Sequence, residues 1–136
     1  MSAMNKTAVC NFNQQVIEQC SRAAFEALVA EDFINHSAAP GQPQGREGLW
    51  HTFHNVLHAG LSELKVEVLD QVAEDDKVTT RKRITGVHSR ALLGIAATGR
   101  EVVIEVIDIV RLRDGQYLEH WGINSLASVL AALRSI

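Results

Sequence analysis

The sequence predicts an α+β fold in one domain, on three observations. Apolar residues recur every three or four positions over residues 4–30 and 46–58, which is typical of amphipathic helices. They alternate with polar ones over residues 64–73 and 78–88, which is typical of half-buried strands. Two further strand-like runs flank an Asp-Gly turn within residues 101–124. Helices followed by an antiparallel meander predict a curved sheet with the helices gathered on one side.

Length and composition restrict the function classes. The 136 residues suffice for one core and are too few for two, so we expect a single domain over residues 1–136. A net charge of −3 offers no broad basic surface, so we expect no nucleic-acid partner. The N-terminus lacks the apolar core of a signal peptide, and no run approaches the roughly 20 apolar residues of a membrane span. We therefore expect a soluble, cytoplasmic protein without a membrane partner.

The first predicted helix carries both cysteines. Cys10 and Cys20 lie ten residues apart, or about 15 Å along one helix, so they cannot form a disulfide within it. Without a Cys-x-x-Cys pair, we interpret them as small, buried, reduced residues.

Residues 31–45 contain both prolines and are predicted to form a loop. This loop keeps Phe33 and Ile34 beside His36, so we expect it to cover a cavity.

The second helix, residues 46–58, places Trp50 and Phe53 on its apolar stripe. Three histidines share a neighbouring face without a carboxylate, so we expect no metal site at His51, His54 and His58.

The strand at residues 78–88 contains the one basic cluster of the chain, at residues 81–83. We expect this cluster to lie on a solvated edge or to pair with carboxylates such as Glu101, Glu105 and Asp108. The loop at residues 89–99 is too apolar to lie free in water, and a short closing helix follows from Leu126.

The hairpin at residues 101–124 is apolar on both faces, which places it inside the sheet. Three polar residues interrupt it: Asp108, His120 and Asn124. An unpaired buried carboxylate costs several kcal/mol. Asp108 must therefore be exposed, paired or lining a cavity.

This order of elements, together with four segments, resembles the SnoaL-like polyketide cyclase family of the nuclear-transport-factor-2-like superfamily. The segments are PQGREGL (43–49), EDDKV (74–78), GVHSRALLGIAATGR (86–100) and IDIVRLRDGQYLEHWG (107–122). The resemblance implies a cone-shaped fold, a curved antiparallel sheet with helices packed on its concave side, and a deep apolar pocket. It also implies a homodimer formed through the sheet face. In the family pattern an acid–base aspartate follows the tryptophan of the last strand, and here Gly122 stands in that position.

The turn decides which hairpin residues meet. A two-residue turn at Asp114-Gly115 puts Asp108 on the face of Trp121, with His120 opposite. A three-residue loop with a bulge at Gly115 instead puts Asp108, His120, Gly122 and Asn124 on one face. The sequence permits either turn, and the pocket geometry implied by the resemblance favours the three-residue loop, which we predict.

Asp108 and His120 are then the candidate catalytic pair. Asp108 acts as the base with His120 orienting it or polarising a carbonyl, or His120 is the base and Asp108 fixes its tautomer. A purely structural role, in which the two bond each other or Arg81 and Arg83, is the alternative. The further residues expected to line the pocket are Phe33, His36, Trp50, Phe53, His88, Leu92, Ile95, Gly122 and Asn124.

Two functions compete on this basis. The first is a cyclase or isomerase that transfers a proton on a small apolar carbonyl compound without a cofactor. The second is a non-catalytic protein that binds a small apolar ligand, or a dimeric scaffold that has lost the acid–base residue of the family.

Overall fold

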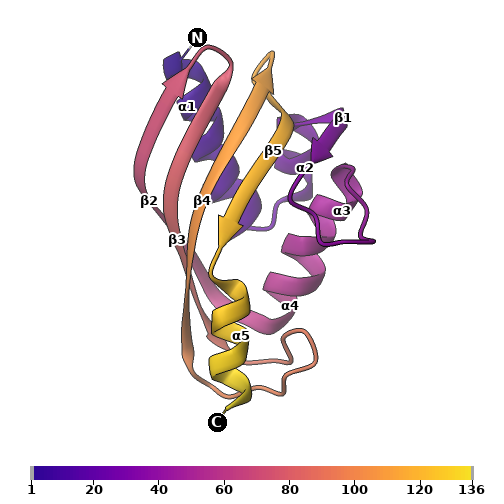
Figure 1. The fold of residues 1–136 in the computed structure, drawn as a ribbon, viewed down its shortest axis with the longest axis vertical. Coiled ribbons are helices and arrows are strands. Elements are labelled where there is room, and N and C mark those ends of the chain that lie inside the picture. Colours follow the sequence, from indigo (N-terminus) through magenta and orange to yellow (C-terminus); the bar gives the residue numbers. More distant parts are fainter. Residues whose placement is uncertain (1, 136) are drawn as a thin grey trace.

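The computed structural model describes residues 2–135 as one curved sheet with helices packed against it (Figure 1). The strands are β1 (Val29–Asn35), β2 (Leu61–Glu74), β3 (Lys77–His88), β4 (Glu101–Arg113) and β5 (Gln116–Asn124). The helical segments, with η marking π-helical turns, are α1 (Ser2–Phe12), η1 (Asn13–Glu18), α2 (Arg22–Leu28), α3 (Arg46–His51), η2 (Thr52–Leu57), α4 (His58–Gly60) and α5 (Leu126–Arg134).

The sheet order is β1-β5-β4-β3-β2. Strands β2 to β5 form an antiparallel meander, and β1 adds to the edge of β5 in parallel. The core lies between the helices and one face of the sheet, where Phe12 and Ile17 join Ile84 and Ile104. The predicted α+β fold is confirmed. Among residues 2–135, no helix has both the length and the apolar content needed to cross a bilayer.

The prediction of one helix over residues 4–30 is wrong. The helix ends after Glu18, and Cys20 adopts a positive φ of 53°. The hydroxyl of Ser21 then caps α2 by accepting the backbone N–H of Ala24 at 3.2 Å. Cys10 is exposed and Cys20 half-buried, so the expectation of two buried cysteines in one helix is also wrong.

The predicted loop at residues 31–45 begins as a strand. β1 is seven residues long and carries Glu31 and Asp32 in its middle, so it lacks the alternation that predicts strands. Its pairing with β5 places Asn35 opposite His120 and buries Phe33 in the core.

The β4–β5 hairpin has a two-residue turn, so the predicted three-residue loop is wrong. Asp114 and Gly115 both have positive φ, at 53° and 75°, as a type I′ turn requires. The register shifts further along, because Leu112 pairs with Tyr117 and Arg111 with Glu119, which leaves one extra residue in β5. This bulge turns His120 to the face of Asp108. The predicted shared face is therefore confirmed, with a bulge in the strand producing it.

Candidate functional site

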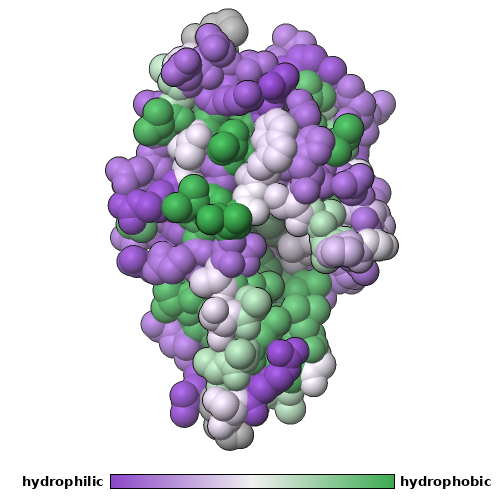
Figure 2. Space-filling model, viewed as in Figure 1, coloured by the Kyte–Doolittle hydropathy of each residue, from purple (hydrophilic) through white to green (hydrophobic). Residues whose placement is uncertain are grey.

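A cavity of about 870 Å³ lies between the sheet and the α3–η2 helix, a size typical of small-molecule sites. Figure 2 shows this face hollowed near its centre, with hydrophobic surface beside the hollow. The apolar lining comes from helices and strands and includes Phe12, Ile17, Leu49, Phe53, Val56, Leu57, Ile84, Ile104 and Val106. The walls therefore suit an apolar ligand.

A buried polar cluster of Asn13, Lys82, Asp108 and His120 interrupts this apolar surface. The Oδ2 of Asp108 lies 3.3 Å from the Nζ of Lys82 and 3.3 Å from the Nε2 of His120. The Lys82 ammonium also donates to the Oδ1 of Asn13 at 2.7 Å. The side chains of Lys82 and Asp108 are only 5% and 7% exposed, so water screens this ion pair weakly.

Residues from β1 complete the surroundings of His120. Its Nδ1 lies 2.9 Å from the Oδ1 of Asn35, and that oxygen also accepts the backbone N–H of Ser37 at 3.0 Å. Both ring nitrogens of His120 are thus engaged. The imidazole is held in one orientation.

The carboxyl group of Asp108 is ionised in this cluster. Burial alone raises the pKa of Asp108, but the Lys82 ammonium and the contacts from His120 outweigh burial and lower it below its usual value. Asp108 is therefore ionised at neutral pH. Burial and the negative charge of Asp108 together raise the pKa of Tyr117 well above its usual value, so this cavity-lining phenol keeps its proton.

One oxygen of the carboxylate has no partner. Among the described residues 2–135, nothing forms a hydrogen bond with the Oδ1 of Asp108, although the atom is buried. Leaving a buried charged acceptor unsatisfied is costly. Asp108 lines the cavity, so a ligand that shifted its side chain would supply a partner for this oxygen.

Gly122 lies opposite Asp108 in the β4–β5 ladder. A Cβ added at Gly122 would come within 3.1 Å of the Cβ of Asp108, and within 3.1 and 3.2 Å of the Cε1 and Nε2 of His120. The imidazole ring thus lies over the glycine, in the space that a side chain at position 122 would enter.

Five of the predicted site residues line the cavity: Phe53, Asp108, His120, Gly122 and Asn124. Leu93, expected in an apolar loop, lines it as well.

The other predicted lining residues are not part of this lining. Phe33 and Leu92 belong to the core at 2% and 0% exposure, and Ile95 packs against that core. His88 is fully buried; its Nδ1 lies 2.9 Å from the Oγ1 of Thr98 and its Nε2 3.2 Å from the carbonyl oxygen of Ile95. These contacts fold the loop at residues 89–99 back onto the end of β3.

Two aromatic stacks hold the remaining predicted residues elsewhere. Trp50 packs against Phe25 and His54, with ring centroids 5.2 and 5.4 Å apart. His36 stacks on Trp121 at 4.8 Å, and its Nε2 lies 2.7 Å from the Oε2 of Glu119.

Sequence reasoning missed Lys82, Asn13, Asn35 and Tyr117. The signal for Lys82 was present, because strict alternation along β3 puts it on the same face as Val78 and Ile84. The expected pairing of the basic cluster is confirmed: Arg83 bonds Glu105 at 2.9 Å, and Lys82 pairs with Asp108. Arg81 pairs with the exposed Asp70. The solvated-edge alternative is wrong, because β3 lies between β2 and β4 and Lys82 is buried.

The histidines of the second helix do not meet around a common point. The Nε2 of His58 contacts the carbonyl oxygen of Ile17 at 2.6 Å, and His54 stacks on Trp50. Within residues 2–135, no group of three or more His, Cys, Asp or Glu side chains is arranged to hold a metal ion.

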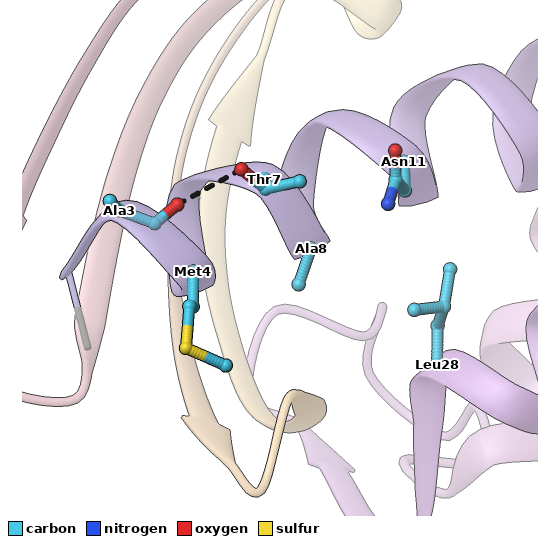
Figure 3. A pocket seen from close by; sticks show the side chains of 6 residues that line it. All are labelled: Ala3, Met4, Thr7, Ala8, Asn11 and Leu28. Carbon is cyan, nitrogen blue, oxygen red and sulfur yellow. Dashed lines mark hydrogen bonds between the residues drawn. The ribbon is translucent and has the colours of Figure 1, made fainter.

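A second depression of about 370 Å³ lies beside α1 and faces Leu28 of α2 (Figure 3). Its lining consists of Ala3, Met4, Thr7, Ala8, Asn11 and Leu28. No ionisable side chain is among them, and the one hydrogen bond drawn joins Thr7 to the carbonyl of Ala3. It offers no chemistry comparable to that of the larger cavity.

Comparison with known proteins assigns the fold to a family. No curated protein matches the sequence. TsrD from Streptomyces laurentii superposes with a TM-score of 0.86 at 21% identity, over 100% of this chain and 98% of its own. IdmH from Streptomyces antibioticus, a proposed polyketide cyclase, gives 0.82 at 26% identity, over 97% of this chain and 99% of its own. An LEH-like epoxide hydrolase of M. tuberculosis superposes with a TM-score of 0.71 at 12% identity, over 98% of this chain and 92% of its own.

The two structures below 25% identity show the shared fold. The sequence match is more specific, because the family model described as SnoaL-like polyketide cyclase covers residues 7–133. The chain therefore belongs to the SnoaL-like polyketide cyclase family.

Proposed function

We propose that the protein is a cyclase or isomerase that transfers a proton on a small apolar carbonyl compound, with Asp108 and His120 as its acid–base pair. The observation that carries this proposal is the Oδ1 of Asp108, a buried carboxylate oxygen without a partner among residues 2–135. Ionised groups in such surroundings are typical of sites where a ligand or a reaction completes the hydrogen bonding. The identity of 26% with IdmH supports the same class of reaction.

The proposed reaction is an intramolecular aldol closure or a related shift of a double bond. A base removes the proton next to a carbonyl, and the electron pair of the broken C–H bond forms an enolate. In a cyclisation the enolate carbon bonds to a second carbonyl carbon of the same molecule, and the new alkoxide takes up the proton as a hydroxyl. A base and a proton donor positioned within one apolar cavity suit both proton transfers.

A second function, ligand binding without catalysis, is favoured by one specific observation. The lowered pKa of Asp108, in which the Lys82 and His120 contacts outweigh burial, makes its carboxylate a weak base. If these contacts persist in the complex, the cavity holds a ligand without reacting with it.

We also propose that the protein is a homodimer through the outer sheet face. Val103, Ile107 and Ile109 of β4 lie on the face opposite Asp108, and they are 39%, 45% and 37% exposed. Glu105, paired with Arg83, lies between Val103 and Ile107 on this face. Exposed apolar residues in the middle of a sheet are typical of a protein interface, and such interfaces also contain polar pairs.

The test begins with thermal unfolding in the presence of a panel of apolar mono- and dicarbonyl compounds. A true ligand at 100 times its dissociation constant stabilises the fold by about 2.7 kcal/mol. Each ligand found is then incubated with the protein and its products are analysed by mass spectrometry and NMR. Conversion to an isomer of equal mass supports the enzyme. Binding without conversion supports the second function, and no stabilisation across the panel overturns both.

A further inference from the structure

We propose that Asn35 and Gly122 together hold His120 as an imidazolium in the wall of the cavity: Asn35 fixes one proton on the imidazole, ionised Asp108 holds the other, and Gly122 leaves the space that the ring occupies. The ring rests as an imidazolium before any ligand binds. The link to catalysis rests on the proposed function, whereas the protonation of the ring is independent of it.

The first step concerns the amide of Asn35. Its Oδ1 lies 3.0 Å from the backbone nitrogen of Ser37, which can only donate, so this atom must be the oxygen. The same oxygen is 2.9 Å from the Nδ1 of His120. Since an amide oxygen only accepts, the Nδ1 of His120 must carry a proton.

The second step concerns the opposite side of the ring. The Nε2 of His120 lies 3.3 Å from the Oδ2 of Asp108. Asp108 is ionised, because the Lys82 ammonium on β3 also lies 3.3 Å from that oxygen. A bare nitrogen lone pair facing a carboxylate oxygen would be repelled, so the Nε2 must also carry a proton.

The charges around the ring support this state. Lys82 and Asp108 neutralise each other, and the phenol of Tyr117 is uncharged because its pKa is raised by burial and by Asp108. Asn13 and Asn35 are neutral amides. The imidazolium therefore shares its one carboxylate with Lys82, which leaves a net positive charge beside the cavity.

The third step concerns space. The imidazole bonds at both nitrogens, so it cannot rotate away from a new side chain without losing one of its partners. A Cβ at position 122 would lie 3.1 Å from the Cε1 and 3.2 Å from the Nε2 of the ring. A side chain at position 122 and the imidazolium of His120 thus compete for one volume.

The decisive experiment is ¹⁵N NMR of the histidine side chains in the ligand-free protein, with His120→Gln used to assign the signals. We expect both nitrogens of His120 to be protonated at pH 7. In Asn35→Ala the ring should lose its second proton at a lower pH than in the wild type. Asn35→Asp keeps an oxygen facing both Ser37 and the ring and adds a negative charge, so both nitrogens of His120 should stay protonated at least as far up in pH as in the wild type. A neutral ring in the wild type, or a titration unchanged in Asn35→Ala, overturns the assignment.

The space requirement is tested separately by a double-mutant cycle in thermal unfolding. Gly122→Ala should lower the melting temperature of the wild type by about 4 °C. In the His120→Ala background, at least half of that loss should disappear, because only the contact with the Cβ of Asp108 remains. Equal losses in both backgrounds overturn the role of Gly122. Both tests need no ligand, so their failure is distinguishable from failure of the proposed function.

Discussion

Asp108 of β4 lies directly opposite Gly122 of β5, and the pair forms a gap in the side-chain layer that the ring of His120 fills. Because Gly122 has no side chain, the ring of His120 can lie against the Asp108 carboxylate on the inner face of an otherwise apolar sheet. It also shows where changes to the sequence should have the largest effects.

Replacing Asp108 should destabilise the protein far more than replacing a surface carboxylate. Asp108→Asn leaves the ammonium of Lys82, 5% exposed, without its counter-charge, which should cost about 3 kcal/mol of the free energy of unfolding. The matched control is Asp70→Asn, which breaks the exposed pair with Arg81 and should cost less than about 1 kcal/mol. Urea denaturation measures both. Equal losses of unfolding free energy in the two variants would show that the buried pair stabilises the protein no more than the exposed pair.

Stability should fall in acid through Asp108. The Lys82 and His120 contacts outweigh burial and lower the pKa of Asp108 in the folded state. A lowered folded pKa gives stability that is present above the unfolded value of about 3.9 and is lost as the pH falls through the folded value. The gap in unfolding free energy between the wild type and Asp108→Asn should therefore shrink below about pH 4. A gap that is constant from pH 7 to pH 3 would contradict an ionised Asp108.

Turnover, once a substrate is found, should depend on His120 and not on His36. His120→Ala removes the proton donor and should lower kcat by about a hundredfold or more. His36→Ala removes an exposed ring paired with Glu119, outside the lining of the cavity, and should leave kcat within about threefold. Steady-state kinetics compares the two variants, and comparable losses would place the chemistry elsewhere.

The oligomeric state should respond to the outer face of β4. Ile107→Lys places a charge among exposed apolar residues and should convert a dimer to a monomer. Met4→Lys is the control, because Met4 is 75% exposed on α1, which packs against the opposite face of the sheet; it should leave the mass unchanged. Light scattering after size exclusion reports the mass directly. A monomeric wild type would remove the dimer proposal.

The sequence was most informative where residue patterns are local. The alternation along β3 and the Asp-Gly turn predicted the central strands, and the apolar hairpin made Asp108 a residue that must be exposed, paired or lining a cavity. The break at Cys20 was missed because the helical spacing of apolar residues continues across it. The strand β1 was missed because its stability comes from pairing with β5, far along the chain.

In the candidate site, too, residues with a local sequence signal were predicted, and residues placed by distant contacts were not. Asp108 and His120 could be named because polar residues in an apolar hairpin are conspicuous. Their common face depends on a bulge beyond the turn, which no residue at the turn itself indicates. Asn13 and Asn35 could not be named, because each enters the site through a contact across 69 or 85 positions of sequence.

The parallel pairing of β1 with β5 has a consequence for assembly. The imidazole of His120 meets Asn35 only when this short edge strand is docked. Fraying of the edge would release the histidine while the central meander stayed intact, since edge elements open at lower free energy than the core. Hydrogen exchange at the amides of β1 would then report the fraction of molecules whose site is assembled.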